Sequence, residues 1–472
     1  MSPAEIAGLA PMVVGAGLAL FLILLIVQVV RYVRATPGMR RSIWLAVRIR
    51  FRWARLAEMA GLCVADKKPT IGAQIGQEFS SDKNRKIEPR TLVPKIKVIP
   101  DEYGVIITAT CLPKVSLEEF QKAARFLADA WGCVRVSVVP ADRPGQVTIR
   151  AVREDPLATT TVHVPTGLPP KDVTRWEIGM DEFALPAIVS FNNVPGATVA
   201  GGTGKGKTSF LNRLLSDLAP SPLVQFAVID GKASSADEGD YASIAPRLFR
   251  FVGDDLKAAN TFLKEMVDLR RRRVALVRSV FGTANMWHQG PTEQWPLIII
   301  IVDEAHTFLR DYKGNDPETK KLAALAADNA RLIEDLVKKG RSVGMVTIPT
   351  TQKPTGDAIP TFIRDICPVS LSFAQRTTDA AVAALGDDIR DWDDANPVNL
   401  QHPSYVGVLV MRADDRPGFI RVRTPYVSDA DTARIAAATA YLTRDPIAFI
   451  VALEGGPNFR KDYPQGPGSL AA

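Results

Sequence analysis

The chain has 472 residues, of which 46% are hydrophobic and 23% are charged, and this composition is typical of folded rather than disordered proteins. At roughly 150 residues per domain, the length predicts two or three domains. Residues 1–55 contain eight arginines and one glutamate, so they carry the entire net charge of +7. A basic surface over the whole protein is therefore excluded.

The N-terminal segment, residues 1–35, predicts a membrane anchor. Ile6–Val30 contains 25 residues without a charge, and a helix of about 20 apolar residues crosses a bilayer. One acid precedes this run and eight arginines follow it. The positive-inside rule then places the N-terminus outside and the rest of the chain in the cytoplasm. We expect a single-pass protein of the cytoplasmic membrane, the alternative being a buried soluble helix.

Residues 36–92 predict a juxtamembrane helix and a linker. Arg40–Val64 is amphipathic and rich in arginine, which favours contact with anionic headgroups. Trp44 and Trp53 are residue types that suit a membrane interface. Residues 65–92 are polar and interrupted by Pro and Gly, which is typical of a linker.

Residues 93–155 predict a small α/β domain without a catalytic constellation. A helix is expected over Ser116–Trp131, because Ser116 and Glu119 have the spacing of a capping box. Alternating apolar residues predict the strands Lys95–Ile99, Gly104–Thr110, Cys133–Val139 and Gln146–Val152.

The pattern changes over residues 160–445 to longer aliphatic strands that alternate with helices. This alternation predicts a mainly parallel sheet with helices on both faces. The expected strands are Ala197–Ala200, Leu223–Ile229, Leu297–Val302, Val343–Ile348 and Val369–Phe373. The tail, residues 446–472, is rich in Gly and Pro from Gly455 onward and is expected to be disordered.

A phosphate-binding loop follows the first of these strands. Its glycines let backbone N–H groups surround phosphates, and the next helix presents its positive end to them. Lys207 would reach the β- and γ-phosphates, and Thr208 would bind Mg²⁺. The loop matches G-x-x-x-x-G-K-[ST] at Gly201, Gly202, Thr203, Gly204, Lys205, Gly206, Lys207 and Thr208.

The strand Leu297–Val302 is fully apolar and ends in two carboxylates, Asp303 and Glu304. Buried carboxylates are costly without a partner, so this pattern indicates a hydrolytic site rather than an acidic loop. Asp303 suits the Mg²⁺ shell, and Glu304 suits the polarisation of an attacking water. Together with Lys207, the pair predicts an ATPase, or less readily a GTPase.

Two further polar residues have candidate roles. Gln352 follows a strand and could contact the γ-phosphate, and Arg341 could stabilise transition-state charge in a neighbouring subunit. The alternatives are an ordinary strand-end residue and a cation at a helix C-terminus. We expect His306 to be structural and Arg270–Arg273 to form a solvated face rather than a DNA contact.

The order of these segments resembles the FtsK/SpoIIIE motor family, and within it the conjugal DNA-transfer proteins of actinomycetes (TraB/TraSA type). The likeness covers roughly residues 160–440. It is carried by GGTGKGKT, VID with Lys232 two residues later, IIIIVDE, KKGRSVG, TTQKP and RVRTPYVSD.

The resemblance implies a RecA-like fold and a hexameric ring that translocates double-stranded DNA with ATP and Mg²⁺. It assigns nucleotide and metal binding to Lys207 and Thr208, hydrolysis to Asp303 and Glu304, and finger and sensor roles to Arg341 and Gln352. Three features depart from the family. Gly231-Lys232-Ala233 replaces Pro-Lys-Gly, Pro349 interrupts the strand before Gln352, and only about 40 residues follow the last strand, too few for a winged-helix DNA reader.

We therefore expect a membrane-anchored ATPase that moves double-stranded DNA in conjugal transfer of a plasmid or integrative element, with other transfer proteins as further partners. The candidate DNA loops are residues 310–321 and 353–364. The alternatives are a protein-secretion ATPase of the type VII kind, a chromosome-partitioning translocase and a membrane scaffold with a degenerate nucleotide switch.

Overall fold

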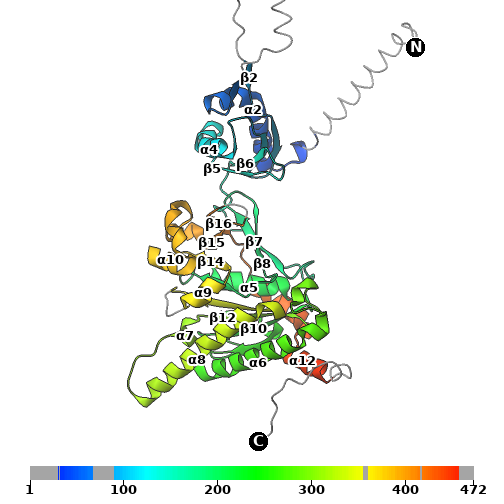
Figure 1. Ribbon diagram of the computed structural model, residues 1–472, viewed down its shortest axis with the longest axis vertical. Coiled ribbons are helices and arrows are strands. Elements are labelled where there is room, and N and C mark those ends of the chain that lie inside the picture. The colour runs from blue at the N-terminus through cyan, green and yellow to red at the C-terminus, as the bar shows by residue number, and fades with distance from the viewer. Residues whose placement is uncertain (1–29, 31, 67–89, 355–359, 415–416, 456–472) are drawn as a thin grey trace, which may run out of the picture. The chain divides into compact units, whose positions relative to one another are not determined.

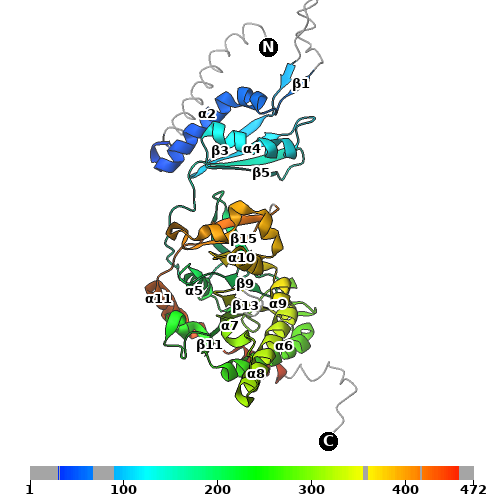
Figure 2. The same cartoon turned by 90° about the vertical axis from the view of Figure 1, so that its left-hand side faces the viewer.

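The computed structural model, shown in Figures 1 and 2, describes residues 30, 32–66, 90–354, 360–414 and 417–455. The chain divides into two compact units, Met1–Pro156 and Leu157–Ala472. Apart from Val30, the predicted membrane span Ile6–Val30 lies outside the described residues, so the anchor stays a prediction.

The first unit is a four-stranded antiparallel sheet, in the order β3-β4-β6-β5, with two helices in its core. Its strands are β3 (Ile96–Pro100), β4 (Gly104–Thr110), β5 (Arg135–Pro140) and β6 (Gln146–Val152), its helices are α2 (Pro37–Met59) and α4 (Leu117–Trp131), and β1 (Val64–Asp66) pairs with β2 (Arg90–Leu92). The predicted capping box is confirmed, because the backbone N–H of Ser116 donates to Glu119 Oε2 at 2.9 Å.

Helix α2 belongs to this unit, which corrects the predicted boundary at residue 93. Leu45, Ile49 and Trp53 on α2 lie in the same hydrophobic core as α4 and the sheet. The Trp53 indole donates to the carbonyl of Pro94 at 2.7 Å. Trp53 is therefore a core residue, and its prediction as a membrane-interface residue is wrong.

The second unit is built on a ten-stranded sheet in the order β11-β10-β12-β13-β9-β14-β15-β16-β7-β8. The strands from β11 to β14 in this order are parallel, and β15, β16, β7 and β8 join by antiparallel pairs. The strands are β7 (Arg175–Asp181), β8 (Pro186–Ser190), β9 (Ala197–Ala200), β10 (Val224–Asp230), β11 (Leu248–Val252), β12 (Leu297–Asp303), β13 (Met345–Thr351), β14 (Val369–Phe373), β15 (Val408–Arg412) and β16 (Phe419–Arg423).

Helices cover both faces of this sheet, as the sequence predicts (Figure 1). Successive side chains of a strand point to opposite faces. Ile299 and Ile301 of β12 therefore pack with α5, and Ile298 and Ile300 pack with α6 and α8. The helices are α5 (Lys207–Leu218), α6 (Leu256–Phe281), α7 (His306–Leu309), α8 (Pro317–Lys339), α9 (Thr361–Ile366), α10 (Thr378–Leu385), α11 (Asp429–Thr439) and α12 (Pro446–Glu454).

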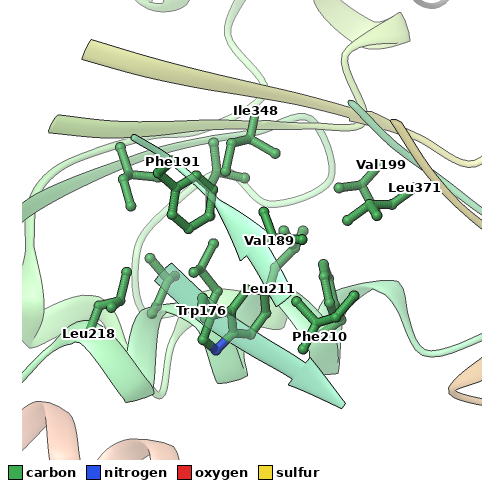
Figure 3. Packing of buried hydrophobic residues seen from close by; sticks show 14 of the residues in the cluster. Trp176, Val189, Phe191, Val199, Phe210, Leu211, Leu218, Ile348 and Leu371 are labelled. Carbon is green, nitrogen blue, oxygen red and sulfur yellow. The ribbon is translucent and has the colours of Figure 1, made fainter. Parts of the chain in front are cut away.

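Helix α5 is held against the sheet by aromatic packing (Figure 3). Trp176 of β7 and Phe210 of α5 have ring centroids 4.8 Å apart, and Phe210 also packs at 5.7 Å against Phe373 of β14. Val189 and Phe191 join the same cluster. Because α5 begins directly at Lys207, this packing fixes the direction in which the phosphate-binding loop faces.

The C-terminal segment corrects the prediction of a disordered tail over residues 446–472. Pro446–Glu454 forms helix α12, whose Ile450 is buried beside α6; residues 456–472 lie outside the described part. By length and a mean hydropathy of 1.3, Asp429–Glu454 could span a membrane. However, it consists of the two α-helices α11 and α12, which residues 440–445 separate, and Ala436 of α11 and Ile450 of α12 lie in the hydrophobic cores of this unit.

Candidate nucleotide-binding site

The phosphate-binding loop connects β9 to α5, in the strand–loop–helix context that the sequence predicts. Gly204 and Gly206 have φ angles of +69° and +103°, a backbone region that glycine adopts without strain. A Cβ atom on Gly201 would lie 2.6 Å from the side chain of Phe373. Two of these glycines thus supply positive φ, and Gly201 allows the loop to pack on β14.

Lys207 extends from the first turn of α5 toward the ends of the neighbouring strands. Its Nζ lies 3.3 Å from Asp303 Oδ1 and 3.8 Å from Glu304 Oε2. The side chain is buried, yet its Nζ has no hydrogen-bond partner among the described residues. An ammonium group with unfilled donors suits the phosphates of a nucleotide.

Asp303 ends β12 and is completely buried. The hydroxyl of Thr350 and the backbone N–H of Glu304 both donate to its Oδ1. Burial by itself would raise the pKa of this carboxyl, but the charges of Lys207 and Lys232, together with these two hydrogen bonds, outweigh burial and lower the pKa to about 2. Asp303 is therefore an anion at every physiological pH, as a metal-binding carboxylate must be.

Lys232 and Asp240 are site residues to which the motif reasoning gave no role. Lys232 Nζ donates to Asp303 Oδ2 at 3.3 Å and lies 3.6 Å from Asp240 Oδ2. The Thr208 hydroxyl donates to the same Asp240 oxygen at 3.2 Å. The sequence does contain a signal for Lys232, because this residue follows the end of β10 by two positions and the carboxyl ends of parallel strands meet at one edge of the sheet.

Glu304 follows Asp303 in a left-handed backbone conformation, with a φ of +50°. Such a φ is uncommon for a residue with a side chain, and it is often found at functional sites. Its Oε2 is buried without a hydrogen-bond partner in the described part of the chain. A carboxylate oxygen with free acceptor capacity beside Lys207 is suited to orienting a water molecule.

Gln352 lies directly over the phosphate-binding loop. Its Oε1 accepts a hydrogen bond from the Thr203 hydroxyl at 2.7 Å. The preceding strand is regular in spite of Pro349, which pairs with Val302 of β12. The structure thus brings Gln352 to the loop, as the sensor role would require.

Asp230 ends β10 and lies beside Asp303 in the register of the two strands. The backbone N–H of Lys232 donates to its Oδ1 at 3.0 Å, and its Oδ2 has no partner among the described residues. Burial raises the pKa of this carboxyl to about 6, and the neighbouring charge of Asp303 adds to the rise. Asp230 is the second acid of the site, beside Asp303, and the pKa values of the two carboxyls are shifted in opposite directions.

Arg341 lies apart from these residues, in the short 3₁₀ helix Arg341–Val343 that precedes β13. It is therefore at the amino end of a parallel strand, whereas the phosphate-binding loop is at the carboxyl end of the neighbouring β9. Three side chains fix this turn. Trp287 donates to the carbonyl of Arg341 at 2.5 Å, and Arg273 and Trp295 donate to the carbonyl of Val343 at 2.9 and 3.1 Å.

Only part of the arginine run of α6 faces solvent, which corrects the prediction of a solvated face for Arg270–Arg273: Arg271 is exposed, whereas Arg270 and Arg273 are buried. Arg273 is fully buried, and its guanidinium stacks on Trp295 at 5.0 Å. Burial lowers its pKa to about 9. Arg270 is also buried and forms an ion pair with Asp335 at 2.8 Å. Arg273 supports the turn that carries Arg341 through its hydrogen bond to Val343.

The two candidate DNA loops are shorter than predicted. Residues 317–321 form the start of α8, and residues 361–364 form part of α9. Residues 355–359 lie outside the described part. His306 begins α7, two residues after Glu304.

The residues present fit a nucleotide with Mg²⁺. The Thr208 hydroxyl and the Asp303 carboxylate are oxygen donors of the kind that Mg²⁺ binds. Lys207 Nζ and Glu304 Oε2 are buried polar atoms without hydrogen-bond partners in the described residues. A bound nucleotide would supply the phosphoryl group, and Mg²⁺ would neutralise its charge. The chain's own part is to hold Lys207, Thr208 and Asp303 at one edge of the sheet, with Glu304 beside them.

Part of the chain is similar to a known family and to several known proteins. Residues 168–301 match the model of the FtsK/SpoIIIE family. DNA translocase FtsK of Leptospira interrogans is 26% identical over 314 residues, which are 63% of this chain and 30% of the relative. DNA translocase SftA of Bacillus subtilis is 28% identical over 207 residues, which are 42% of this chain and 20% of the relative. The chain thus spans about a third or less of these curated relatives.

Two solved structures are also similar. The monomer form of the pCW3 conjugation coupling protein TcpA with ATPγS is 20% identical, covers 74% of this chain and 94% of its own, and has a TM-score of 0.49. The cytoplasmic domain of the type VII secretion ATPase EccC of Thermomonospora curvata is 17% identical, covers 62% of this chain and 34% of its own, and has a TM-score of 0.44.

The strand–loop–helix with Lys207, next to the buried strand that ends in Asp303 and Glu304, defines the protein as a P-loop ATPase. More narrowly, residues 168–301 are similar to the FtsK/SpoIIIE family.

Proposed function

We propose that this protein is an ATP-dependent translocase of double-stranded DNA, with Mg²⁺ as its metal. The observation that carries the proposal is the grouping of Lys207, Asp303 and Glu304 at one edge of the sheet, within and just beyond residues 168–301, which match the FtsK/SpoIIIE family model. The Lys207 ammonium lies within 4 Å of a carboxylate oxygen of Asp303 and of one of Glu304. The assignment of DNA as the substrate is supported by the FtsK and SftA relatives.

The finer parts of the proposal are membrane anchoring through residues 1–35, assembly as a hexameric ring, and a role in conjugal transfer. The uncharged run Ile6–Val30 supports the anchor. The position of Arg341 supports the ring, because a fixed turn presents this exposed side chain at the edge of the sheet opposite its own nucleotide site. The conjugal role rests on the sequence resemblance alone.

DNA contacts are proposed for the segment between α7 and α8 and for the start of α8. Lys313, Lys320 and Lys321 are exposed there. Cations on such a segment would meet phosphates without reading the sequence. Each phosphate contact contributes a slope of about −0.9 to the dependence of log affinity on log salt.

The experiment is ATP turnover of the full chain in detergent, with and without duplex DNA at low salt. We expect turnover to rise with duplex DNA. In the variant that combines Lys313→Glu, Lys320→Glu and Lys321→Glu, this stimulation by DNA should depend less on the salt concentration. Lys122→Glu with Arg125→Glu, on exposed α4 positions, is the matched charge control. Stimulation by a secreted peptide and not by DNA would contradict the proposal and favour a secretion ATPase.

A further inference from the structure

One face of α2 is exposed and carries a stripe of aromatic, arginine and methionine side chains. Trp44, Arg48, Phe51, Arg55 and Met59 follow one another at intervals of three or four residues, which places them on one side of a helix. Trp44, Phe51 and Met59 are 66%, 86% and 66% exposed. The opposite side of α2 is buried in the core of the first unit, so this orientation is fixed.

The same face is strongly cationic. Helix α2 contains six arginines, and Glu58 is its one acidic residue. Arg52 and Arg55 are exposed, and in the described part of the chain neither has a hydrogen-bond or ion-pair partner. The guanidinium groups of Arg52 and Arg55 are therefore available to pair with an external anion.

The stripe borders two open hollows on the surface of the first unit. One, of about 620 Å³, is lined by residues that include Arg41, Trp44, Arg48 and Trp131. The other, of about 460 Å³, is lined by residues that include Arg52, Arg55 and Met59. Both combine guanidinium groups with apolar walls, a combination that suits the phosphate and glycerol of a lipid headgroup.

We propose that this face of α2 lies flat on an anionic bilayer. Trp44, Phe51 and Met59 would enter the headgroup region, and Arg52 and Arg55 would pair with lipid phosphates. Exposed apolar side chains between cations are typical of interfacial helices, whereas a DNA backbone offers nothing for Phe51 and Met59 to bury against. Only six residues separate the uncharged run Ile6–Val30 from the start of α2 at Pro37. If this run spans the bilayer, α2 begins close to the bilayer surface.

The test uses tryptophan quenching by brominated lipids, with the full chain in nanodiscs of phosphatidylcholine with and without phosphatidylglycerol. Trp44 is the first tryptophan of the chain, so quenching cannot arise in the predicted span. We expect quenching that grows with phosphatidylglycerol and is lost in Trp44→Phe. Arg52→Glu with Arg55→Glu should remove the dependence on phosphatidylglycerol.

The matched control is Lys122→Glu with Arg125→Glu, which reverses two exposed charges on α4 and should leave the quenching unchanged. Circular dichroism and ATP turnover verify that each variant is folded, and Phe51→Ser gives a second variant with reduced quenching. Absence of quenching in the intact chain, or equal quenching in Trp44→Phe, would overturn the proposal. So would a Trp44 emission that responds to duplex DNA but not to anionic lipid.

Discussion

Lys232 donates a hydrogen bond to Asp303, with Nζ 3.3 Å from Oδ2. Lys207 lies at the same distance from the other oxygen of this carboxylate. Two cations therefore share one buried anion, and neither comes from the strand that carries it. A nucleotide that draws Lys207 away would leave Asp303 compensated by Lys232.

Lys232→Met should destabilise the protein in buffer free of nucleotide and metal, by roughly 1–3 kcal/mol, because a buried charge loses a hydrogen-bonded partner. The pKa of Asp303 is lowered to about 2, against an unfolded value of about 3.9. Its contribution to stability is thus full above pH ~4 and is lost as pH falls toward ~2. Urea unfolding should show the difference from the unmodified chain shrinking through that window. A difference independent of pH would contradict the role of Lys232, and Lys257→Met at an exposed site of α6 is the control.

Asp230→Asn should stabilise the protein at alkaline pH. Because the folded pKa of Asp230 is about 6 and thus raised, its contribution to stability is present below pH ~4 and is lost as pH rises through about 6. The asparagine cannot ionise, so the gain should grow from pH 4 to pH 8 and reach roughly 1–3 kcal/mol. Thermal unfolding of both forms in a metal chelator measures this gain. An equal gain in stability at pH 4 and at pH 8 would show that Asp230 is ionised in the folded protein at both pH values.

Glu304→Gln should bind ATP and hydrolyse it about 10²–10⁴-fold more slowly, because an amide cannot polarise the attacking water. Lys207→Ala should instead lose binding, since the phosphates lose their buried cation. Fluorescent-nucleotide binding and single-turnover hydrolysis separate the two effects. Glu238→Gln, at an exposed position near the site, is the control for loss of a carboxylate. Normal turnover in Glu304→Gln would reassign the general base.

Arg341→Ala should abolish turnover in a uniform assembly while leaving ATP binding intact. If Arg341 acts on the neighbouring subunit, mixing this variant with Glu304→Gln subunits, which retain Arg341, should restore part of the activity. Arg271→Ala, an exposed arginine of α6, should have no effect. Failure of every mixture to recover turnover would contradict action in trans and leave Arg341 as a support for its turn.

The sequence was a good guide wherever a short segment determines its own geometry. The phosphate-binding loop and the acidic pair after an apolar strand need only local context, and the parallel register then brings Lys207 and Asp303 together. Lys232 follows β10 by two residues, so the same reasoning could reach it, whereas Asp240 depends on a longer loop that returns to the sheet edge, which no local spacing predicts.

Burial was harder to predict for cationic and amphipathic helices. Arg273 lies in a run of arginines that suggests a solvated face, yet its guanidinium donates hydrogen bonds to two backbone carbonyls and stacks on Trp295. In α2, the spacing of apolar residues predicts one apolar face, and that face packs into a protein core through Trp53. The spacing alone does not distinguish a face that packs into a protein core from one that contacts a membrane. Only the tertiary fold decides between these environments.

The central claim is that ATP hydrolysis at Lys207, Asp303 and Glu304 moves the protein along duplex DNA. Displacement of a triplex-forming strand from linear duplex DNA tests it most directly, with the purified full chain and with Glu304→Gln as the control. We predict displacement that requires ATP and is lost in Glu304→Gln. ATP turnover that duplex DNA does not stimulate, with no displacement by the intact protein, would contradict the claim.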